Sequence, residues 1–362
     1  MKVVIILGLF SGLFAYLSRY KKTQWGLKVS FGLIFVFLAL RYDFGNDYET
    51  YLKAFGDLNQ YGLFSATDNL NNFEPGWVVL NRLFRPLGFF GMTAVLALVN
   101  SIVYYYFIKT YVPIRYYWMA VCLYVFDPEF MLIQLSAMRQ TVAILLFIIS
   151  LNFLSTKRPV QYFLCIGVAM LFHTSAVILL PVYLLGLFVN WHSNIVNKSI
   201  SGVIAICLFA LLYIIREYVT AILNFLINSY YDRYLDYQNP GELHSGLGVV
   251  YGLGILFLAI YYGNTQNKRI ESIVSVAMLN YFLIPLNIII SMITRIDFYF
   301  YPAIFVAYPV ILNNFKSPVI RVLFLTLTFA FAGYKFYGYI NFEDNPEHYG
   351  TYKTIFSASK WY

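Results

Sequence analysis

Three arginines lie at the ends of long apolar runs, where a charged side chain can reach a polar compartment. Arg41 ends one run, Arg139 opens a second, and Arg295 opens a third. A guanidinium keeps its charge at any relevant pH and can bind two oxygens of a phosphate or carboxylate at once. These positions predict stabilisation of an anionic group, although an arginine at a helix end can also simply extend its charge into water.

Three other side chains have the chemistry of a general base. His173 lies between two short apolar runs, Glu74 precedes a proline, and Asp47 begins a short amphipathic stretch. Each can accept a proton from a reacting hydroxyl. The structural alternatives are a hydrogen-bonded histidine, a carboxylate that caps the helix started by Pro75, and a solvated aspartate. The sequence does not choose among the three bases.

The sequence gives little support for a metal or a nucleotide. Asp127-Pro128-Glu129 is the one acid-x-acid pattern that could hold a divalent cation. The sequence contains no P-loop, no glycine-rich nucleotide fingerprint, no zinc motif and no Gly-x-Ser-x-Gly elbow. We expect no cofactor and no metal.

For Arg295, an ion pair with Asp297 that holds the helix end is the structural alternative to ligand binding.

The composition places these residues in a membrane protein. Hydrophobic residues make up 60% of the chain and charged residues 12%, whereas soluble domains carry about 25% charged residues. Apolar runs near the length of a membrane-spanning helix predict an all-α polytopic protein of about 12 transmembrane helices. The runs are 3–18, 27–41, 88–108, 116–134, 137–155, 160–172, 174–190, 199–217, 246–263, 270–291, 296–313 and 318–338.

The charges sort onto the two sides of such a membrane. The short connections on one side hold 13 of the 25 Lys and Arg residues and one of the 17 Asp and Glu residues. Basic loops stay in the cytoplasm. Both termini and the acidic segments are therefore predicted to lie outside, in the periplasm of a bacterium. The positive net charge then reflects cytoplasmic loops, and no nucleic-acid partner is expected.

Residues 1–362 are predicted to form one integral membrane domain with three sizeable external segments. Two are the loops 42–87 and 218–245, both with amphipathic helices that lie at the membrane surface. The third is the polar and aromatic tail 339–362. The short runs between 160 and 190 are interpreted either as two full spans or as broken half-helices.

Five short motifs follow one another along the chain. They are Arg-x-x-x-Gly-x-Asp-Tyr-x-x-Tyr from Arg41, Glu-Pro-Gly-Trp from Glu74, Arg-Gln at Arg139, Phe-His-x-Ser from Phe172 and Arg-x-x-x-Tyr-Phe from Arg295. Taken in order, these motifs resemble the EpsG-like group of Wzy-type polysaccharide polymerases. The tail sequence His-Tyr-Gly-Thr-Tyr from His348 is also similar to the family's tail, so the resemblance covers nearly the whole chain.

The resemblance implies a membrane glycosyltransferase of the bacterial inner membrane, with a fold like that of O-antigen ligases and an active site that faces the periplasm. Such a protein polymerises undecaprenyl-diphosphate-linked oligosaccharide units into O-antigen, capsule or exopolysaccharide and releases undecaprenyl diphosphate, without a metal. The implied partners are the lipid-linked oligosaccharide and membrane lipids, with a chain-length regulator and a flippase as further candidates.

This chemistry assigns roles to the residues named above. The diphosphate leaving group would be stabilised by Arg41, Arg139 and Arg295, with Arg233 as a weaker candidate. The acceptor hydroxyl would lose its proton to His173, Glu74 or Asp47. The side chains expected to contact sugars are Tyr48, Tyr51, Trp77, Gln140, Tyr299 and Tyr301.

Two other functions fit a membrane protein of this kind. A flippase for the same lipid-linked unit needs charged residues deep in its spans, whereas the charged motifs here cluster at the outer edge. A membrane acyltransferase that modifies sugars would draw acyl groups from the cytoplasm, and no His-Arg constellation lies on that side. Polymerisation is therefore the preferred interpretation.

Overall fold

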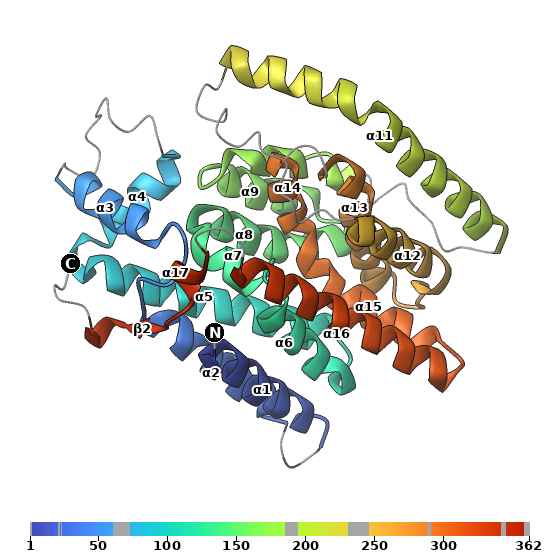
Figure 1. Cartoon of the computed structure of the whole chain (residues 1–362), viewed down its shortest axis with the longest axis horizontal. Helices are drawn as coiled ribbons and strands as arrows, with labels where there is room; N and C mark the ends of the chain where they lie inside the picture. Colours follow the sequence, from blue (N-terminus) through green and yellow to red (C-terminus); the bar gives the residue numbers. More distant parts are fainter. Residues whose placement is uncertain are drawn as a thin grey trace. The chain divides into compact units, whose positions relative to one another are not determined.

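The computed structural model describes residues 2–20, 22, 24–60, 73–184, 195–230, 246–287, 291–341 and 345–357. Helices dominate the described residues (Figure 1). Contacts between residues divide the chain into two compact units. The first contains Met1–Phe153, Lys157–Leu180 and Leu323–Tyr362, and the second contains Leu154–Thr156 and Pro181–Val322.

The first unit holds both ends of the described chain. Its α1 packs on α2 and α6, and α2 also packs on α5. Its helices are α1 (Lys2–Leu17), α2 (Gly26–Leu40), α3 (Tyr48–Leu58), α4 (Pro75–Leu83), α5 (Gly88–Tyr111), α6 (Tyr117–Phe126), α7 (Met131–Ser136), most of α8 (Met138–Ser155), α9 (Pro159–Met170), most of α16 (Pro318–Asn341) and α17 (Asn345–Tyr349). Short 3-10 helices occupy Arg85–Leu87, Ile114–Tyr116, Thr174–Leu179 and Ile355–Ser357.

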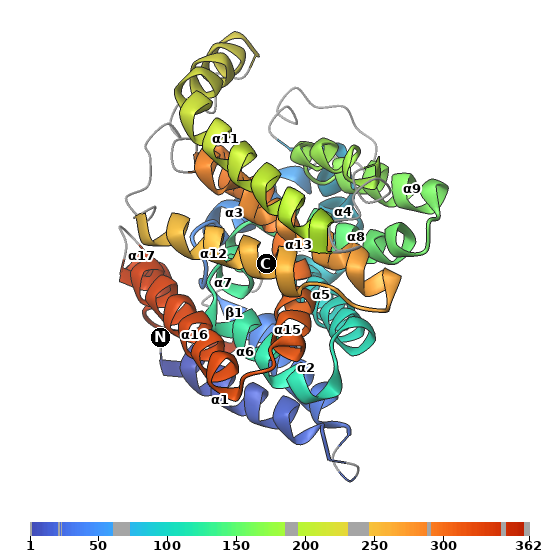
Figure 2. The same cartoon turned by 90° about the vertical axis from the view of Figure 1, so that its right-hand side faces the viewer.

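The second unit is built around α13 (Lys268–Asn287), which contacts its other four helices (Figure 2). Those helices are α11 (Ile195–Tyr230), α12 (Gly246–Tyr262), α14 (Ser291–Phe300) and α15 (Ile304–Asn314). A 3-10 turn, Tyr301–Ala303, separates α14 from α15.

Five described helical segments are long and apolar enough to cross a membrane, and several shorter helices are equally apolar. The chain is therefore an all-α membrane protein. The number of 12 spans and the external position of both termini stay predictions. The five segments are Arg85–Tyr111, Met138–Ser155, Lys198–Ile215, Arg295–Asn314 and Pro318–Asn341.

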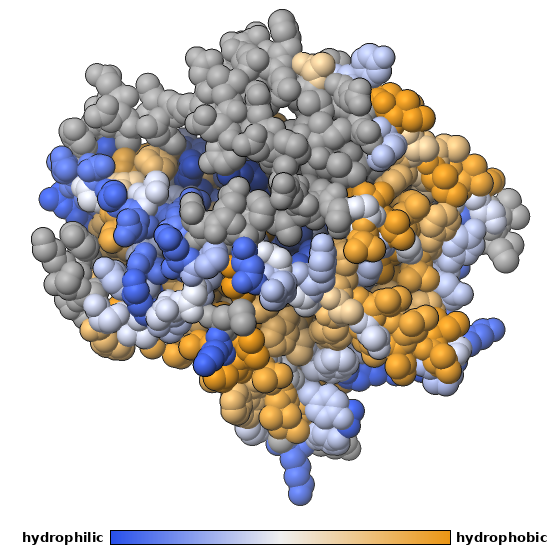
Figure 3. Space-filling view, viewed as in Figure 1, coloured by the Kyte–Doolittle hydropathy of each residue, from blue (hydrophilic) through white to orange (hydrophobic). Residues whose placement is uncertain are grey.

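The surface of the first unit fits a lipid environment along its helices and water at one end. Leu323 on α16 is 55% exposed and Leu327 is 54% exposed, and apolar residues gather over this helix in Figure 3. A water-soluble protein rarely exposes so large an apolar stripe. The outer face of α3, in contrast, carries Glu49, Lys53 and Asp57, all exposed, and the α3 side of the surface is hydrophilic in Figure 3.

Three predicted helices differ from those observed. The run 116–134 is broken at 127–130 into α6 and α7, as its internal Asp-Pro-Glu sequence indicated. The run 296–313 is divided by the 3-10 turn Tyr301–Ala303, which contains Pro302; a proline inside an α-helix removes a backbone hydrogen bond. The predicted span 199–217 and the first part of the predicted loop 218–245 form one continuous helix, because α11 extends from Ile195 to Tyr230. Residues 231–245 of that loop lie outside the described residues, and its external position stays a prediction.

A break separates the two short runs between 160 and 190. The α9 helix has 12 residues, and a turn at 171–173 separates it from the 3-10 helix Thr174–Leu179. The α9 helix is too short to cross a membrane alone, whereas residues 185–190 of the second run lie outside the described residues. The exposed backbone of such a break must be satisfied by protein or water, and this break is part of the site described below.

A two-stranded sheet joins the C-terminal tail to the end of α2. Strand β1 (Arg41–Tyr42) pairs antiparallel with β2 (Lys353–Thr354), with Arg41 opposite Thr354. An ion pair of 2.8 Å between Lys353 Nζ and Asp43 Oδ2 supports the pairing. The predicted external loop and the predicted external tail therefore meet.

The glycines of α1 allow a testable prediction about its packing on α6. A Cβ atom at Gly8 would overlap the ring of Phe126, whereas a Cβ at Gly32 of α2 would meet nothing within 4 Å. We expect Gly8→Ala to destabilise the protein by about 1–3 kcal/mol through overpacking. Gly32→Ala, the matched control, should be neutral or slightly stabilising. Thermal unfolding in detergent measures both, and equal melting temperatures would contradict the packing.

Candidate functional site

An ion pair between Arg139 and Glu74 is the centre of the candidate site in the first unit. Arg139 Nη1 lies 2.5 Å from Glu74 Oε2. The two side chains are 25% and 13% exposed, respectively, so the pair is largely shielded but can still be reached. The guanidinium lies over the ring of Phe73, 5.1 Å from its centroid. Charge-assisted bonds of this kind are among the strongest in proteins.

Glu74 is directed away from its own helix. It occupies the N-cap position of α4, with Pro75 at the first helical position, yet its side chain makes no capping hydrogen bond. The predicted structural role as a capping carboxylate is therefore wrong for the side chain. Its second oxygen, Oε1, accepts a hydrogen bond of 3.4 Å from the backbone N–H of Thr174.

The start of α4 is fixed against the broken segment after α9. The Gly76 N–H donates to the carbonyl of Leu171 at 2.8 Å. A Cβ atom at position 76 would lie 2.6 Å from that same oxygen, so only glycine permits this approach. The contact brings the carboxylate of Glu74 to the His173–Thr174 junction.

Arg139 is the second residue of α8 and follows a break in the helix at Ala137 (φ −85°, ψ 60°). Its Nε donates a long hydrogen bond of 3.5 Å to the hydroxyl of Tyr51 on α3. Burial raises the pKa of Tyr51 although the guanidinium opposes this effect, so the hydroxyl stays neutral at physiological pH. Within the described part of the chain, no partner takes the second terminal nitrogen of Arg139, Nη2.

His173 directly precedes Thr174, whose N–H contacts Glu74, and the His173 ring is hydrogen-bonded to Ser175. Its Nδ1 is 2.6 Å from the hydroxyl of Ser175, and the following residue donates its N–H to Glu74. The structure therefore brings together Arg139, Glu74 and the His173 segment, which are three of the predicted motifs.

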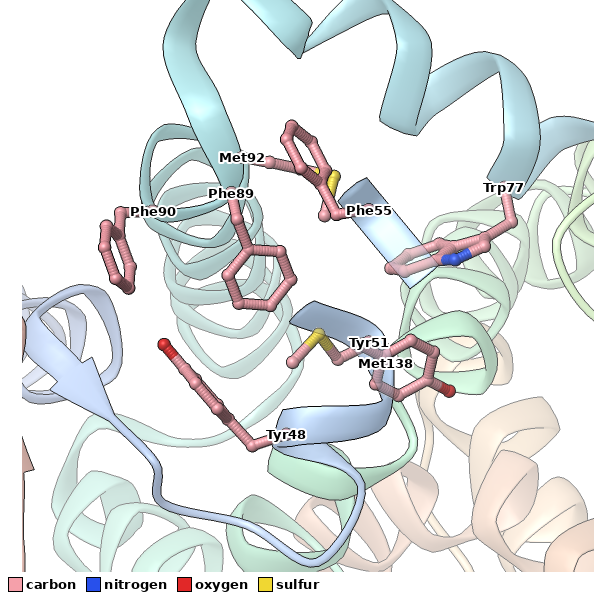
Figure 4. Close-up of a cluster of buried hydrophobic side chains, with 8 residues drawn as sticks. All are labelled: Tyr48, Tyr51, Phe55, Trp77, Phe89, Phe90, Met92 and Met138. Carbon is pink, nitrogen blue, oxygen red and sulfur yellow. The ribbon is translucent and has the colours of Figure 1, made fainter. Parts of the chain in front are cut away.

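Three of the rings expected to contact sugars, those of Tyr48, Tyr51 and Trp77, are buried in the first unit. Tyr51 packs edge-on against Trp77, with 5.2 Å between ring centroids, and Tyr48 packs likewise against Phe89. Figure 4 shows these side chains between α3, α4, the start of α5 and α8. In this arrangement Tyr48 and Trp77 have no exposed face on which a sugar could stack, because both are 1% exposed or less. The prediction did not distinguish an aromatic core from an aromatic binding surface.

Other predicted residues occupy different surroundings in the first unit. Arg41 is buried, and its Nη1 donates to the carbonyls of Phe44 at 3.0 Å and Leu135 at 2.8 Å. Asp47 is exposed at the N-cap of α3, and Gln140 is buried in α8. A role for Arg41 in diphosphate binding stays a prediction.

The remaining predicted residues belong to the second unit or lie outside the description. Arg295 and Tyr301 are half-buried, in α14 and in the turn after it, and Tyr299 is buried. Arg233 lies outside the described residues. Their roles stay predictions.

The comparison with known families decides the classification. The family model described as the EpsG family matches residues 25–354, which is most of the chain. The chain belongs to the EpsG family. No curated protein and no solved structure matches it. The match includes Arg41, Glu74, Arg139 and the tail through the last residue of β2, and the family is associated with polysaccharide biosynthesis.

A second charged cluster in this EpsG-family chain involves a residue that the sequence reasoning missed. Lys335 Nζ on α16 lies 2.8 Å from Asp127 Oδ2 and 2.7 Å from Glu129 Oε2. The ammonium thus lies between the two carboxylates that the sequence offered as a weak metal site. Among the described residues, no group of three or more His, Cys, Asp or Glu side chains could hold a metal. An ionisable residue inside an apolar run was the signal for Lys335.

The sequence reasoning also missed the groups that complete the Arg139 site, and only one of them, the Phe73 ring, carried a signal in the sequence. The backbone N–H of Thr174 and the carbonyl of Leu171 carry no side-chain signal. The Phe73 ring under Arg139 directly precedes Glu74, so its place next to the motif was visible, but its contact with a residue in α8 was not.

The charged cluster at Lys335 gives a prediction about stability. Lys335→Met leaves two carboxylates together in a buried site, and loss of one partner from a buried ion pair costs about 3–5 kcal/mol. Burial raises the pKa of Glu129 to about 7, with a further rise from Asp127 and an opposing effect of Lys335. The folded state therefore binds a proton on the Glu129 carboxyl more tightly than the unfolded state does. The contribution of Glu129 to stability then falls as pH rises towards about 7.

Thermal unfolding in detergent tests this cluster. The melting temperature of Lys335→Met should drop more at about pH 8 than at about pH 5. Adding Asp127→Asn and Glu129→Gln should recover much of the loss, because it removes the unpaired charges. A Lys335→Met protein as stable as the wild type at both pH values would show that the cluster does not hold α16.

Proposed function

We propose that this protein polymerises undecaprenyl-diphosphate-linked oligosaccharide repeat units by glycosyl transfer. The growing chain is moved from its lipid carrier to the non-reducing end of another unit, and undecaprenyl diphosphate is released. The reaction takes place on the periplasmic face of the bacterial inner membrane. The observation that carries this proposal is the partly exposed Arg139–Glu74 ion pair at the start of an apolar helix in an EpsG-family chain.

The arginine supplies what the leaving group needs. When the bond between the anomeric carbon and the diphosphate oxygen breaks, its electron pair leaves with the diphosphate, whose negative charge grows. A guanidinium already held in place stabilises that charge without reorganisation. Nη2 of Arg139 has no partner within the described part of the chain, and the side chain is 25% exposed, which supports its access to a phosphate oxygen.

The carboxylate is suited to the other half of the reaction. The acceptor hydroxyl oxygen bonds to the anomeric carbon and must lose its proton. A diphosphate that binds Arg139 competes with Glu74 for the same guanidinium. Glu74, still held by the Thr174 N–H, is then released to take that proton. His173 is the alternative base, since the segment that carries it contacts the same carboxylate. Asp47, the third candidate, is exposed at the N-cap of α3.

The partners follow from this reaction. The substrate is a lipid-linked oligosaccharide whose polyprenyl tail lies among membrane lipids. A flippase supplies the substrate from the cytoplasmic side, and a chain-length regulator acts on the growing polymer.

The first test is a gel profile of surface glycan from cells that lack this gene. The deletion should leave single repeat units and no ladder. Complementation with Arg139→Ala should fail, because loss of one preorganised donor costs about 10²–10³ in rate. Arg158→Ala, an exposed arginine at the start of α9, is the matched control and should restore the ladder at equal protein levels.

Other outcomes of this test would overturn the proposal. Loss of even the single unit would indicate export or an earlier step. An intact ladder with an altered mass per repeat would indicate acyl transfer. A full ladder with Arg139→Ala would remove the arginine from the reaction.

The choice of base gives a separate prediction. Glu74→Gln keeps the shape of the side chain but cannot accept a proton, so polymerisation should fall by about 10²–10⁴. His173→Asn should lower the rate much less. The initial rate of polymer formation by purified protein in lipid vesicles measures both, and the reverse order would assign the base to His173.

A further inference from the structure

The C-terminal tail returns to the segment that carries Arg139. After α16 the chain forms α17, and its β2 strand then pairs with β1. Tyr349, the last residue of α17, is 1% exposed. Its ring packs edge-on against Phe44, with 5.2 Å between centroids. The tail is thus a packed part of the first unit.

The hydroxyl of Tyr349 lies in a chain of hydrogen bonds whose directions can be assigned. The N–H of Asn46 donates to Ser136 Oγ at 3.0 Å. Ser136 Oγ lies 2.6 Å from the Tyr349 hydroxyl, which donates to the carbonyl of Leu132 at 3.1 Å. A hydroxyl has one proton to give, so Ser136 donates to Tyr349. The hydroxyl of Tyr339 lies 3.1 Å from the hydroxyl oxygen of Tyr349.

Ser136 is three residues before Arg139, at the point where the helix is interrupted. It is the last residue of α7, and α8 begins at Met138 after the break at Ala137. Two hydrogen bonds of 2.8 Å also hold the break, from the Ala137 N–H to the carbonyl of Ile133 and from the Thr141 hydroxyl to the carbonyl of Gln134. The contacts of Ser136 add a third constraint, which joins the start of α8 to the C-terminal tail.

We infer that Tyr349 is a positioning residue, which holds Arg139 against Glu74 through Ser136 and the α7–α8 break. This inference rests on the proposed function, since Arg139 is the group that would bind the diphosphate. A displacement of about 1 Å at such a group can cost about 10²-fold in rate. Burial raises the pKa of Tyr349, so its hydroxyl keeps the proton that the chain requires at physiological pH.

The test uses tyrosine-to-phenylalanine variants of the full-length protein in lipid vesicles. Tyr349→Phe keeps the ring and removes only the hydroxyl. Tyr352→Phe is the matched control, because this hydroxyl in the same tail donates to the carbonyl of Phe37 and not to Ser136. The readouts are polymerisation kinetics with a lipid-linked repeat unit and hydrogen exchange of the backbone amides at 136–141.

We expect Tyr349→Phe to lower kcat about ten- to hundredfold with little change in KM, and to speed exchange at 136–141 at temperatures well below its melting transition. Ser136→Ala should also lower kcat, and the double variant should lose less than the sum of the two single losses, because both substitutions remove the Ser136–Tyr349 hydrogen bond. Tyr352→Phe should change neither readout.

The two readouts separate this inference from the proposed function. Unchanged exchange and unchanged kcat in Tyr349→Phe would overturn the positioning role. A lower kcat that merely follows a lower melting temperature would also overturn it, since a structural role explains that result. Faster exchange at 136–141 in Tyr349→Phe, with a wild-type protein that makes no polymer, would support the positioning of Arg139 and overturn glycosyl transfer.

Discussion

The interruption of the helix between Ser136 and Met138 is the constraint on which the candidate site depends. A helix that ends in apolar surroundings leaves carbonyl groups that must find donors. Four consecutive carbonyls of α7 have such donors: Leu132 binds the Tyr349 hydroxyl, Ile133 the N–H of Ala137, Gln134 the Thr141 hydroxyl and Leu135 the guanidinium of Arg41. Two distant segments, the end of α2 and the C-terminal tail, are thereby bound to the turn that presents Arg139.

Arg41 and Arg139 look alike in the sequence but have different surroundings. Arg41 is buried, donates to backbone carbonyls and lies over the ring of Tyr48, so its contacts stabilise the helix break. Arg139 is partly exposed and pairs with a carboxylate that a stronger anion can replace. The first arrangement suits a structural anchor, and the second suits a group that exchanges partners during a reaction.

Local features of the fold were predictable from the sequence, and contacts between distant segments were not. Hydropathy located most of the helices, the alternation of charged and apolar residues located α3, and Glu74-Pro75 located the start of α4. The hydrogen bond between Ser136 and Tyr349 joins residues that are 213 positions apart, and no spacing rule connects them. The burial of Trp77 was missed because an aromatic residue suits a core and a sugar site equally well.

The ion pair itself explains why the proposed reaction would begin only when the substrate binds. Both side chains are largely buried, and an unpaired charge in such a place is unfavourable. Without an anion, Arg139 therefore stays on Glu74, and the carboxylate is not available to take a proton. A diphosphate offers the guanidinium more oxygen atoms and more charge than one carboxylate, and the Thr174 N–H keeps Glu74 in place when the pair opens. Diphosphate binding and release of the base would then be a single event, so the acceptor hydroxyl is activated only beside a bound donor.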